Sequence, residues 1–125
     1  MTPPTILLVD DDALLGGTLQ SVLRVLGYTV LRAQNGREAL TLYDPQTVAL
    51  VLTDLIMPDM EGVELIIALR QRHPTVKVIA MSGGGRNQPE AYLKIAHQVG
   101  AVKTLAKPFP LESLRTAVAE CLAAP

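Results

Sequence analysis

Six side chains that can take part in chemistry follow short apolar runs of this sequence of 125 residues. They are Asp10, Asp11, Asp12, Asp54, Ser82 and Lys107. If the apolar runs are neighbouring strands, each close pair of these carboxylates repels by up to ~4 kcal/mol at an effective dielectric constant of about 20. A hard divalent cation relieves such repulsion, and a few carboxylates with room for water favour Mg²⁺ over Ca²⁺. The sequence therefore predicts a Mg²⁺ site, with Lys107 as a second positive charge.

Carboxylates, a metal ion, a hydroxyl and an ammonium group together are typical of phosphoryl transfer, in which positive groups neutralise the transferring oxygens. One carboxylate can then act as the nucleophile. Asp54 is the candidate, because it stands alone after its apolar run and precedes a loop, whereas the N-terminal aspartates can hold the metal. Asp12 is expected only to cap the helix that follows it. Asp59 and Glu61 are expected in the solvated loop and turn before Gly62.

Five apolar runs are the strand candidates. They are Ile6–Val9, Thr29–Leu31, Val48–Thr53, Val76–Met81 and Val102–Ala106. Most of them lack the alternation of a half-exposed strand, and continuous apolar runs are what a parallel sheet covered on both faces requires. The runs therefore predict a buried parallel sheet.

Helical patterns separate these runs. They cover Ala13–Leu26, Arg37–Tyr43, Val63–Arg72, Glu90–Val99 and Leu111–Leu122. Strand and helix thus alternate five times, which predicts an α/β fold, a three-layer sandwich of a five-stranded parallel sheet with five helices. In such sheets ligand sites form beyond the carboxyl ends of the strands, near a switch in strand order. The six polar side chains lie at these ends.

Composition limits the class of protein. The length suits one domain, residues 1–125, with no output domain visible. The formal net charge of -1 argues against direct binding of nucleic acid, and no apolar run is long enough for a membrane span. The single cysteine, Cys121, excludes an intramolecular disulfide and favours the cytoplasm. It lies on an apolar stripe and is expected to pack as a small hydrophobic residue.

Four segments, in order and with matching spacing, resemble the receiver domain of bacterial two-component response regulators, as in chemotaxis regulators. They are Ile6-Leu-Leu-Val-Asp-Asp-Asp12, Thr53-Asp-Leu-Ile-Met-Pro-Asp-Met-Glu-Gly62, Met81-Ser-Gly83 and Lys107-Pro-Phe109. The resemblance covers nearly the whole chain. It implies a flavodoxin-like, doubly wound sheet with strand order 2-1-3-4-5, and a signalling switch that catalyses only its own phosphorylation and dephosphorylation.

The resemblance also implies a role for each site residue. Asp54 would accept a phosphoryl group from a phosphohistidine of a sensor histidine kinase or histidine phosphotransfer protein. Ser82 and Lys107 would bind phosphoryl oxygens, and the Lys107–Pro108 peptide bond would be cis. The Mg²⁺ ligands would be Asp10, Asp11, Asp54 and the backbone carbonyl of Ile56. Phosphorylation would alter a surface that an unidentified protein partner recognises, and a phosphorylation-dependent dimer stays open.

One position departs from the family pattern. Receiver domains commonly carry Tyr or Phe three residues before the lysine, where this chain has Thr104. Either Thr104 acts as a smaller polar switch, or output runs through the loop and helix after Ser82. The loop, residues 83–89, is rich in glycine and is expected to be flexible.

Two other classes of protein are weighed against this one. A Mg²⁺-dependent phosphohydrolase of the haloacid-dehalogenase type would use Asp10 and Asp12, but Leu14 stands where a small hydroxyl residue is expected, and 125 residues leave no room for a cap domain. A flavin or nucleotide carrier would place phosphate near the acidic cluster, where carboxylates repel it unless a metal is present.

Overall fold

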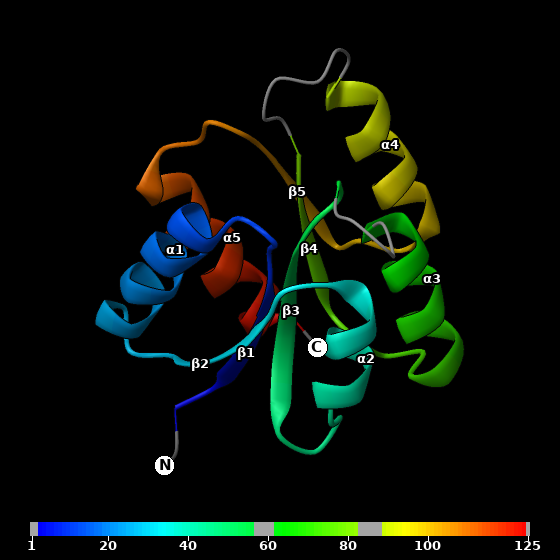
Figure 1. Cartoon of the computed structure of the whole chain (residues 1–125), viewed down its shortest axis with the longest axis horizontal. Coiled ribbons are helices and arrows are strands. Elements are labelled where there is room, and N and C mark those ends of the chain that lie inside the picture. The colour runs from blue at the N-terminus through cyan, green and yellow to red at the C-terminus, as the bar shows by residue number, and fades with distance from the viewer. Residues whose placement is uncertain (1–2, 57–61, 83–88, 125) are drawn as a thin grey trace.

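The computed structural model describes residues 3–56, 62–82 and 89–124. Strands and helices alternate through these segments (Figure 1). The strands are β1 (Thr5–Val9), β2 (Thr29–Ala33), β3 (Val48–Asp54), β4 (Val78–Ser82) and β5 (Lys103–Ala106). The helices are α1 (Ala13–Val25), α2 (Gly36–Leu42), α3 (Gly62–Arg72), α4 (Pro89–Val99) and α5 (Leu111–Ala123). Each element that the sequence predicts is therefore present.

All strand pairs are parallel, and the strand order is β2-β1-β3-β4-β5. This confirms the predicted flavodoxin-like order. The order reverses at β1, which lies between β2 and β3, so the chain leaves β1 and β3 in opposite directions. A crevice forms at such a switch, beyond the carboxyl ends of the two strands.

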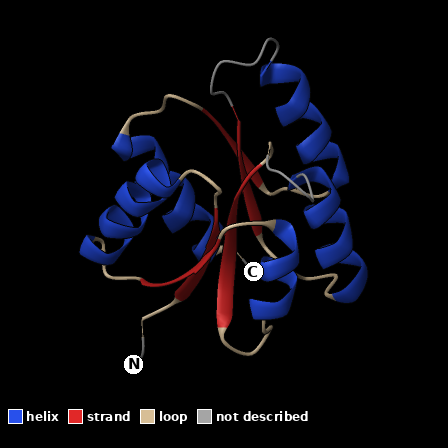
Figure 2. Ribbon diagram, in the orientation of Figure 1, coloured by secondary structure: helices blue, strands red, loops and turns tan. Residues whose placement is uncertain are grey.

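Helices cover both faces of the sheet, which gives the predicted three layers (Figure 2). On one face, α2, α3 and α4 pack on the side chains of Leu7, Val9 and Val51 in a first apolar cluster. On the other face, α1 and α5 pack on Ile6 and Leu8 in a second cluster. Neighbouring residues of β1 thus belong to different clusters, which explains why its sequence is continuously apolar.

Two strand boundaries differ from the prediction by two residues, and the others agree with it to within one residue. β2 continues two residues past Leu31, because Arg32 and Ala33 keep pairing with Leu8 and Val9 of β1 although Arg32 interrupts the apolar run. β4 begins at Val78 rather than Val76. The amide of Val76 instead donates to the carbonyl of His73 at 3.0 Å, in the turn that follows α3.

Several smaller predictions are confirmed. Asp12 caps α1, where its Oδ1 accepts from the amides of Leu14 and Leu15 at 3.0 Å each. Cys121 is buried in the second apolar cluster, as expected for a small hydrophobic residue.

The Lys107–Pro108 peptide bond is cis, as predicted. The predictions for Asp59, Glu61 and the glycine-rich segment up to residue 88 lie outside the described residues. In the segments that the structure does describe, no helix has both the length and the apolar character that crossing a membrane requires.

Candidate functional site

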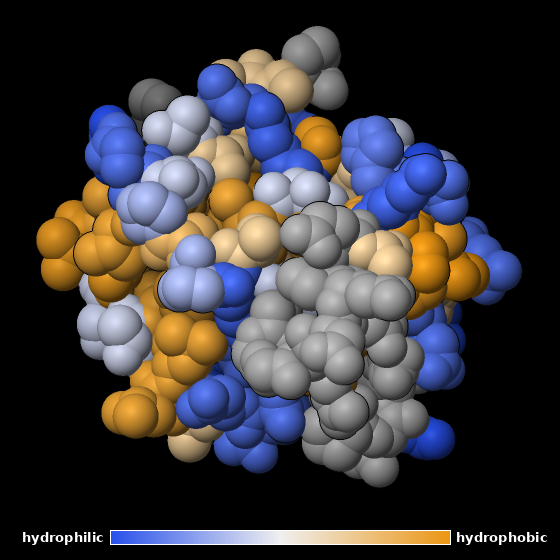
Figure 3. Space-filling model, turned by 90° about the horizontal axis from the view of Figure 1, so that it is seen from above, coloured by the Kyte–Doolittle hydropathy of each residue, from blue (hydrophilic) through white to orange (hydrophobic). Residues whose placement is uncertain are grey.

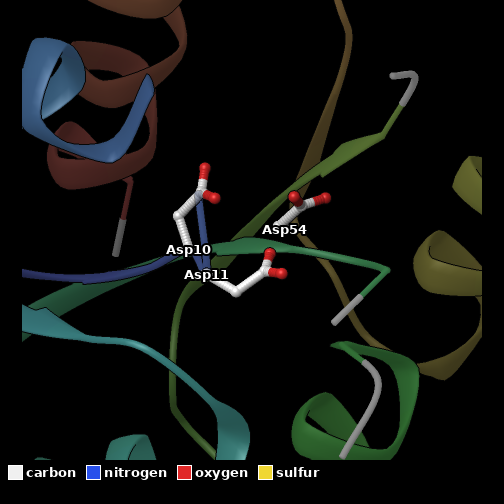
Figure 4. Close-up of side chains that lie close together, drawn as sticks. All are labelled: Asp10, Asp11 and Asp54. Carbon is white, nitrogen blue, oxygen red and sulfur yellow. The ribbon is translucent and has the colours of Figure 1, made fainter. Parts of the chain in front are cut away.

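Three of the predicted carboxylates meet at the switch in strand order. Asp10 and Asp11 follow β1, and Asp54 ends β3, the strand beside it. One oxygen of each carboxylate lies within 4.8 Å of the other two. Figure 4 shows the three side chains gathered at this edge of the sheet. Asp10 and Asp54 are buried, whereas Asp11 is exposed.

Asp10 is the most deeply buried of the three, and burial raises the pKa of its carboxyl group. The Asp12 amide and the Lys107 ammonium oppose this shift, while Asp54 and Asp11 add to it. Oδ1 of Asp10 accepts from the Asp12 amide at 2.8 Å. Its Oδ2 is buried and has no hydrogen-bond partner within the described part of the chain. That oxygen is therefore open to a further cationic partner.

Lys107 brings a positive charge to this cluster from the end of β5. Its Nζ lies 3.0 Å from Oδ2 of Asp54 and 3.7 Å from Oδ2 of Asp10. The backbone amide of Lys107 donates to the Ser82 carbonyl at 2.6 Å, which ties the lysine to the end of β4. The predicted lysine thus lies in the same site as two of the predicted carboxylates.

Ser82 and Ile56 lie beside this cluster. Ser82 ends β4, one residue past Met81, the partner of Asp54 in the sheet. Its hydroxyl is buried and finds no hydrogen-bond partner among the described residues. Ile56 follows Asp54 by two residues, and its amide donates to Oδ1 of Asp54 at 3.5 Å, a long hydrogen bond. The predicted site residues therefore lie at the same end of the sheet.

The donor set fits a hard divalent cation. All side-chain donors of the cluster are carboxylate oxygens, the ligands that Mg²⁺ prefers. Two oxygens on one Mg²⁺ ion are at most about 4.2 Å apart, and the separations here are within 4.8 Å, so small rotations would suffice. The buried Oδ2 of Asp10, which lacks a hydrogen bond, supports the same conclusion.

Sequence reasoning missed one residue at this site. Arg32, at the end of β2, donates from Nη2 to the backbone carbonyls of Asp10 at 3.4 Å and Asp12 at 3.2 Å. The only signal in the sequence is a basic residue that interrupts an apolar run. Thr104, the departure from the family pattern, lies half-buried in β5, opposite Ala80 of β4.

Comparison with known proteins identifies the family. The profile of the response regulator receiver domain matches residues 6–119. The chain is 38% identical over 121 residues to the sensor kinase CckA of Brucella abortus, covering 94% of this chain and 12% of the kinase. It is 31% identical over 117 residues to sporulation initiation phosphotransferase F of Bacillus subtilis, covering 94% of this chain and 92% of that protein.

A solved structure agrees with these matches. The CheY-like response regulator receiver domain protein from Methanospirillum hungatei superposes with a TM-score of 0.84 at 28% identity, covering 97% of this chain and 94% of the other. The chain therefore belongs to the response regulator receiver domain family, and its function is that of a phosphoacceptor switch in signalling. These matches give no support to a haloacid-dehalogenase-type phosphohydrolase. The chain spans between 12% and 43% of the length of several curated relatives, which are kinases or transcriptional regulators.

Proposed function

We propose that Asp54 accepts a phosphoryl group from a phosphohistidine of a sensor histidine kinase or a histidine phosphotransfer protein. The observation that carries this proposal is the ion pair of Asp54 with Lys107 at 3.0 Å, inside a cluster of three carboxylates. In the reaction an oxygen of Asp54 bonds to phosphorus while the bond from phosphorus to the donor imidazole breaks. The neutral imidazole leaves once it has taken up a proton.

The remaining site residues would bind the group being transferred. Asp10, Asp11, Asp54 and the Ile56 carbonyl would hold Mg²⁺, which when bound neutralises negative charge on the phosphoryl oxygens. Lys107 would bind one phosphoryl oxygen with the ammonium that now contacts Asp54. The Ser82 hydroxyl, buried without a partner in the described residues, would donate to another. Water would later attack the phosphoaspartate, so the domain catalyses only its own phosphorylation and dephosphorylation.

An apolar surface beside the site supports a protein as the phosphodonor. Leu14, Val25 and Leu111 are 83%, 87% and 55% exposed. One apolar hollow of about 360 Å³ lies between α1 and α5, and a second of about the same volume lies between α1 and residues 107–111. Leu111 lines both hollows, and Lys107 lines the second. In Figure 3, hydrophobic side chains gather on this side of the molecule. A donor that packs in the hollow lined by Lys107 would lie near Asp54, because Lys107 also forms the ion pair with Asp54.

We further propose that residues 1–125 act as one domain in the cytoplasm. A single sheet joins all described helices, and both of its faces are covered. The free thiol of Cys121 suits a reducing compartment.

Intact mass spectrometry after incubation with acetyl phosphate tests the central proposal. The native chain is expected to gain one phosphoryl group in the presence of Mg²⁺ and none in EDTA. Asp54→Asn should gain none. Asp12→Asn, which removes a charge from the same acidic run but keeps a capping side chain, should gain one. The proposal is wrong if Asp54→Asn gains a phosphoryl group as the native chain does, or if the native chain is labelled equally in Mg²⁺ and in EDTA.

A further inference from the structure

Arg32 contacts the backbone on both sides of Asp11. Its Nη2 donates to the carbonyl of Asp10 and to the carbonyl of Asp12, at 3.4 and 3.2 Å. Arg32 reaches them from the carboxyl end of β2, an edge strand, on the face that α1 covers. One guanidinium group therefore bridges the carbonyl of the residue before Asp11 and the carbonyl of the residue after it.

Gly16 makes room for this guanidinium group. A Cβ atom built on Gly16 would lie 2.0 Å from Nη2 of Arg32 and 2.4 Å from its Cζ. Atoms that are not bonded to each other do not come this close, so any side chain at position 16 would displace the guanidinium group of Arg32. The next residue of α1 is also glycine, but a Cβ atom on Gly17 would meet nothing within 4 Å. The close approach is thus particular to Gly16.

The position of the Asp11 carboxylate depends on the backbone more than the positions of the Asp10 and Asp12 carboxylates do. Asp10 is buried at the end of β1, and its carboxylate accepts from the Asp12 amide. The Asp12 carboxylate is fixed by capping α1. Asp11 is exposed, and its side chain makes no hydrogen bond to the described part of the chain. The backbone that Arg32 holds therefore sets where the Asp11 side chain begins, and no hydrogen bond from the described residues adds a second restraint.

We propose that Arg32, seated over Gly16, is a positioning residue that holds Asp11 in place for divalent-cation binding. The proposal rests on the proposed function, because it assumes that the Asp10, Asp11 and Asp54 cluster binds Mg²⁺. Arginine suits the role, since its planar group stays charged and offers several donors in fixed directions. Residues that orient metal ligands affect metal affinity without touching the metal.

Calorimetric titration of the native chain and its variants with Mg²⁺, without a phosphodonor, tests the proposal. Arg32→Met should bind Mg²⁺ about 10-fold more weakly, the lower end of the range for such residues, because both hydrogen bonds are long. Arg32→Lys should recover part of the loss, since it keeps a cation that can reach one carbonyl. Gly16→Ala should weaken binding by a similar factor.

Two matched variants separate positioning from general stability. Gly17→Ala makes the same change one residue along α1 in open space, and it should leave the Mg²⁺ affinity unchanged. Arg70→Met removes an arginine that packs over a glycine, Gly100, near the amino end of β5 and away from the carboxylates. It should also leave the affinity unchanged. Urea unfolding of every variant gives its stability independently.

A double substitution provides the strictest comparison. Gly16→Ala combined with Arg32→Met should bind Mg²⁺ as weakly as either single variant, because both remove the same contact. If Arg32→Met and Gly16→Ala lose stability but bind Mg²⁺ as the native chain does, Arg32 has only a structural role and the proposal is overturned. If Arg32→Met does not fold, Gly16→Ala against Gly17→Ala decides alone. Failure of the native chain to bind Mg²⁺ would refute the proposed function instead.

Discussion

Removing the charge of Asp10 should make the metal-free protein more stable. The carboxylate is buried and lies beside Asp11 and Asp54, whose charges repel it. Asparagine at this position keeps an oxygen that can accept from the Asp12 amide. Asp10→Asn therefore removes the repulsion while retaining the main hydrogen bond. The native chain would carry the repulsion because the same charge binds the metal.

The size of the effect follows from the distances in the cluster. At 4.8 Å and an effective dielectric constant of 20, each repulsion is about 3.5 kcal/mol. The attraction of Lys107 at 3.7 Å is about 4.5 kcal/mol on the same scale. The net repulsion is about 2.5 kcal/mol, which solvent screening at the exposed Asp11 reduces to about 1 to 2 kcal/mol. A gain of that size raises the Tm by about 5 °C for a domain of this length.

The effect should depend on pH with a definite sign. Because burial raises the folded-state pKa of Asp10 above its unfolded value near 3.8, the native state binds the proton more tightly than the unfolded state. The resulting stability is fully present below the unfolded pKa and is lost as pH rises through the folded pKa. The advantage of Asp10→Asn should therefore be full above the folded-state pKa of Asp10 and shrink as pH falls toward 3.8.

Urea unfolding at pH 7 in EDTA, repeated in saturating Mg²⁺, measures this prediction. Mg²⁺ at 100 times its Kd stabilises the native state by about 2.7 kcal/mol, and a variant that binds it poorly loses that gain. Asp10→Asn should thus be the more stable protein in EDTA and the less stable one in Mg²⁺. Asp12→Asn serves as control and should change little in either buffer. A variant that is no more stable than the native chain in EDTA would refute the electrostatic argument.

Three further outcomes are expected. Lys107→Met should lower the unfolding free energy of the metal-free chain by about 1 to 3 kcal/mol, because Asp54 loses a charged hydrogen-bond partner. The same substitution should abolish labelling by acetyl phosphate. A fully labelled variant would contradict the assignment of Lys107 to the site. Asp12→Ala should cost about 1 kcal/mol in urea unfolding, against little for Asp12→Asn, because only alanine removes the cap of α1. Burial raises the pKa of the Cys121 thiol, so an aromatic disulfide reagent should react with it slowly in the native chain and rapidly in urea; equal rates would show that the thiol is accessible.

The location of the site could be predicted because it depends on topology more than on side-chain detail. The strands are parallel, so their carboxyl ends meet at one edge. Asp54 and Ser82 end strands, and Asp10 and Lys107 directly follow strands. A shift of one or two residues in a strand boundary leaves them at that edge. The error at the start of β4 was of this kind, since Val76 is buried like a strand residue but lies in a turn.

The contacts of Arg32 could not be predicted, because they join positions 20 and 22 residues apart through a side-chain direction. Its place in β2 was itself missed, since the prediction ended the strand at Leu31 where the apolar run stops. Backbone hydrogen bonds pair β2 with β1, and this pairing continues through Arg32 whatever side chain that position carries. The pairing of Arg32 with Leu8 places its side chain on the face of the sheet that α1 covers. Only from that face can it reach the backbone carbonyls of Asp10 and Asp12.

The two glycines of α1 make the same point at the level of single residues. By helix propensity Gly16 and Gly17 are equivalent, and each is unfavourable by about 1 kcal/mol relative to alanine. The sequence therefore offers one explanation for both, a locally weak helix. In the folded chain Gly16 faces the guanidinium of Arg32, whereas Gly17 faces open space. The first glycine is needed for a contact with another strand, and nothing in the structure explains the second.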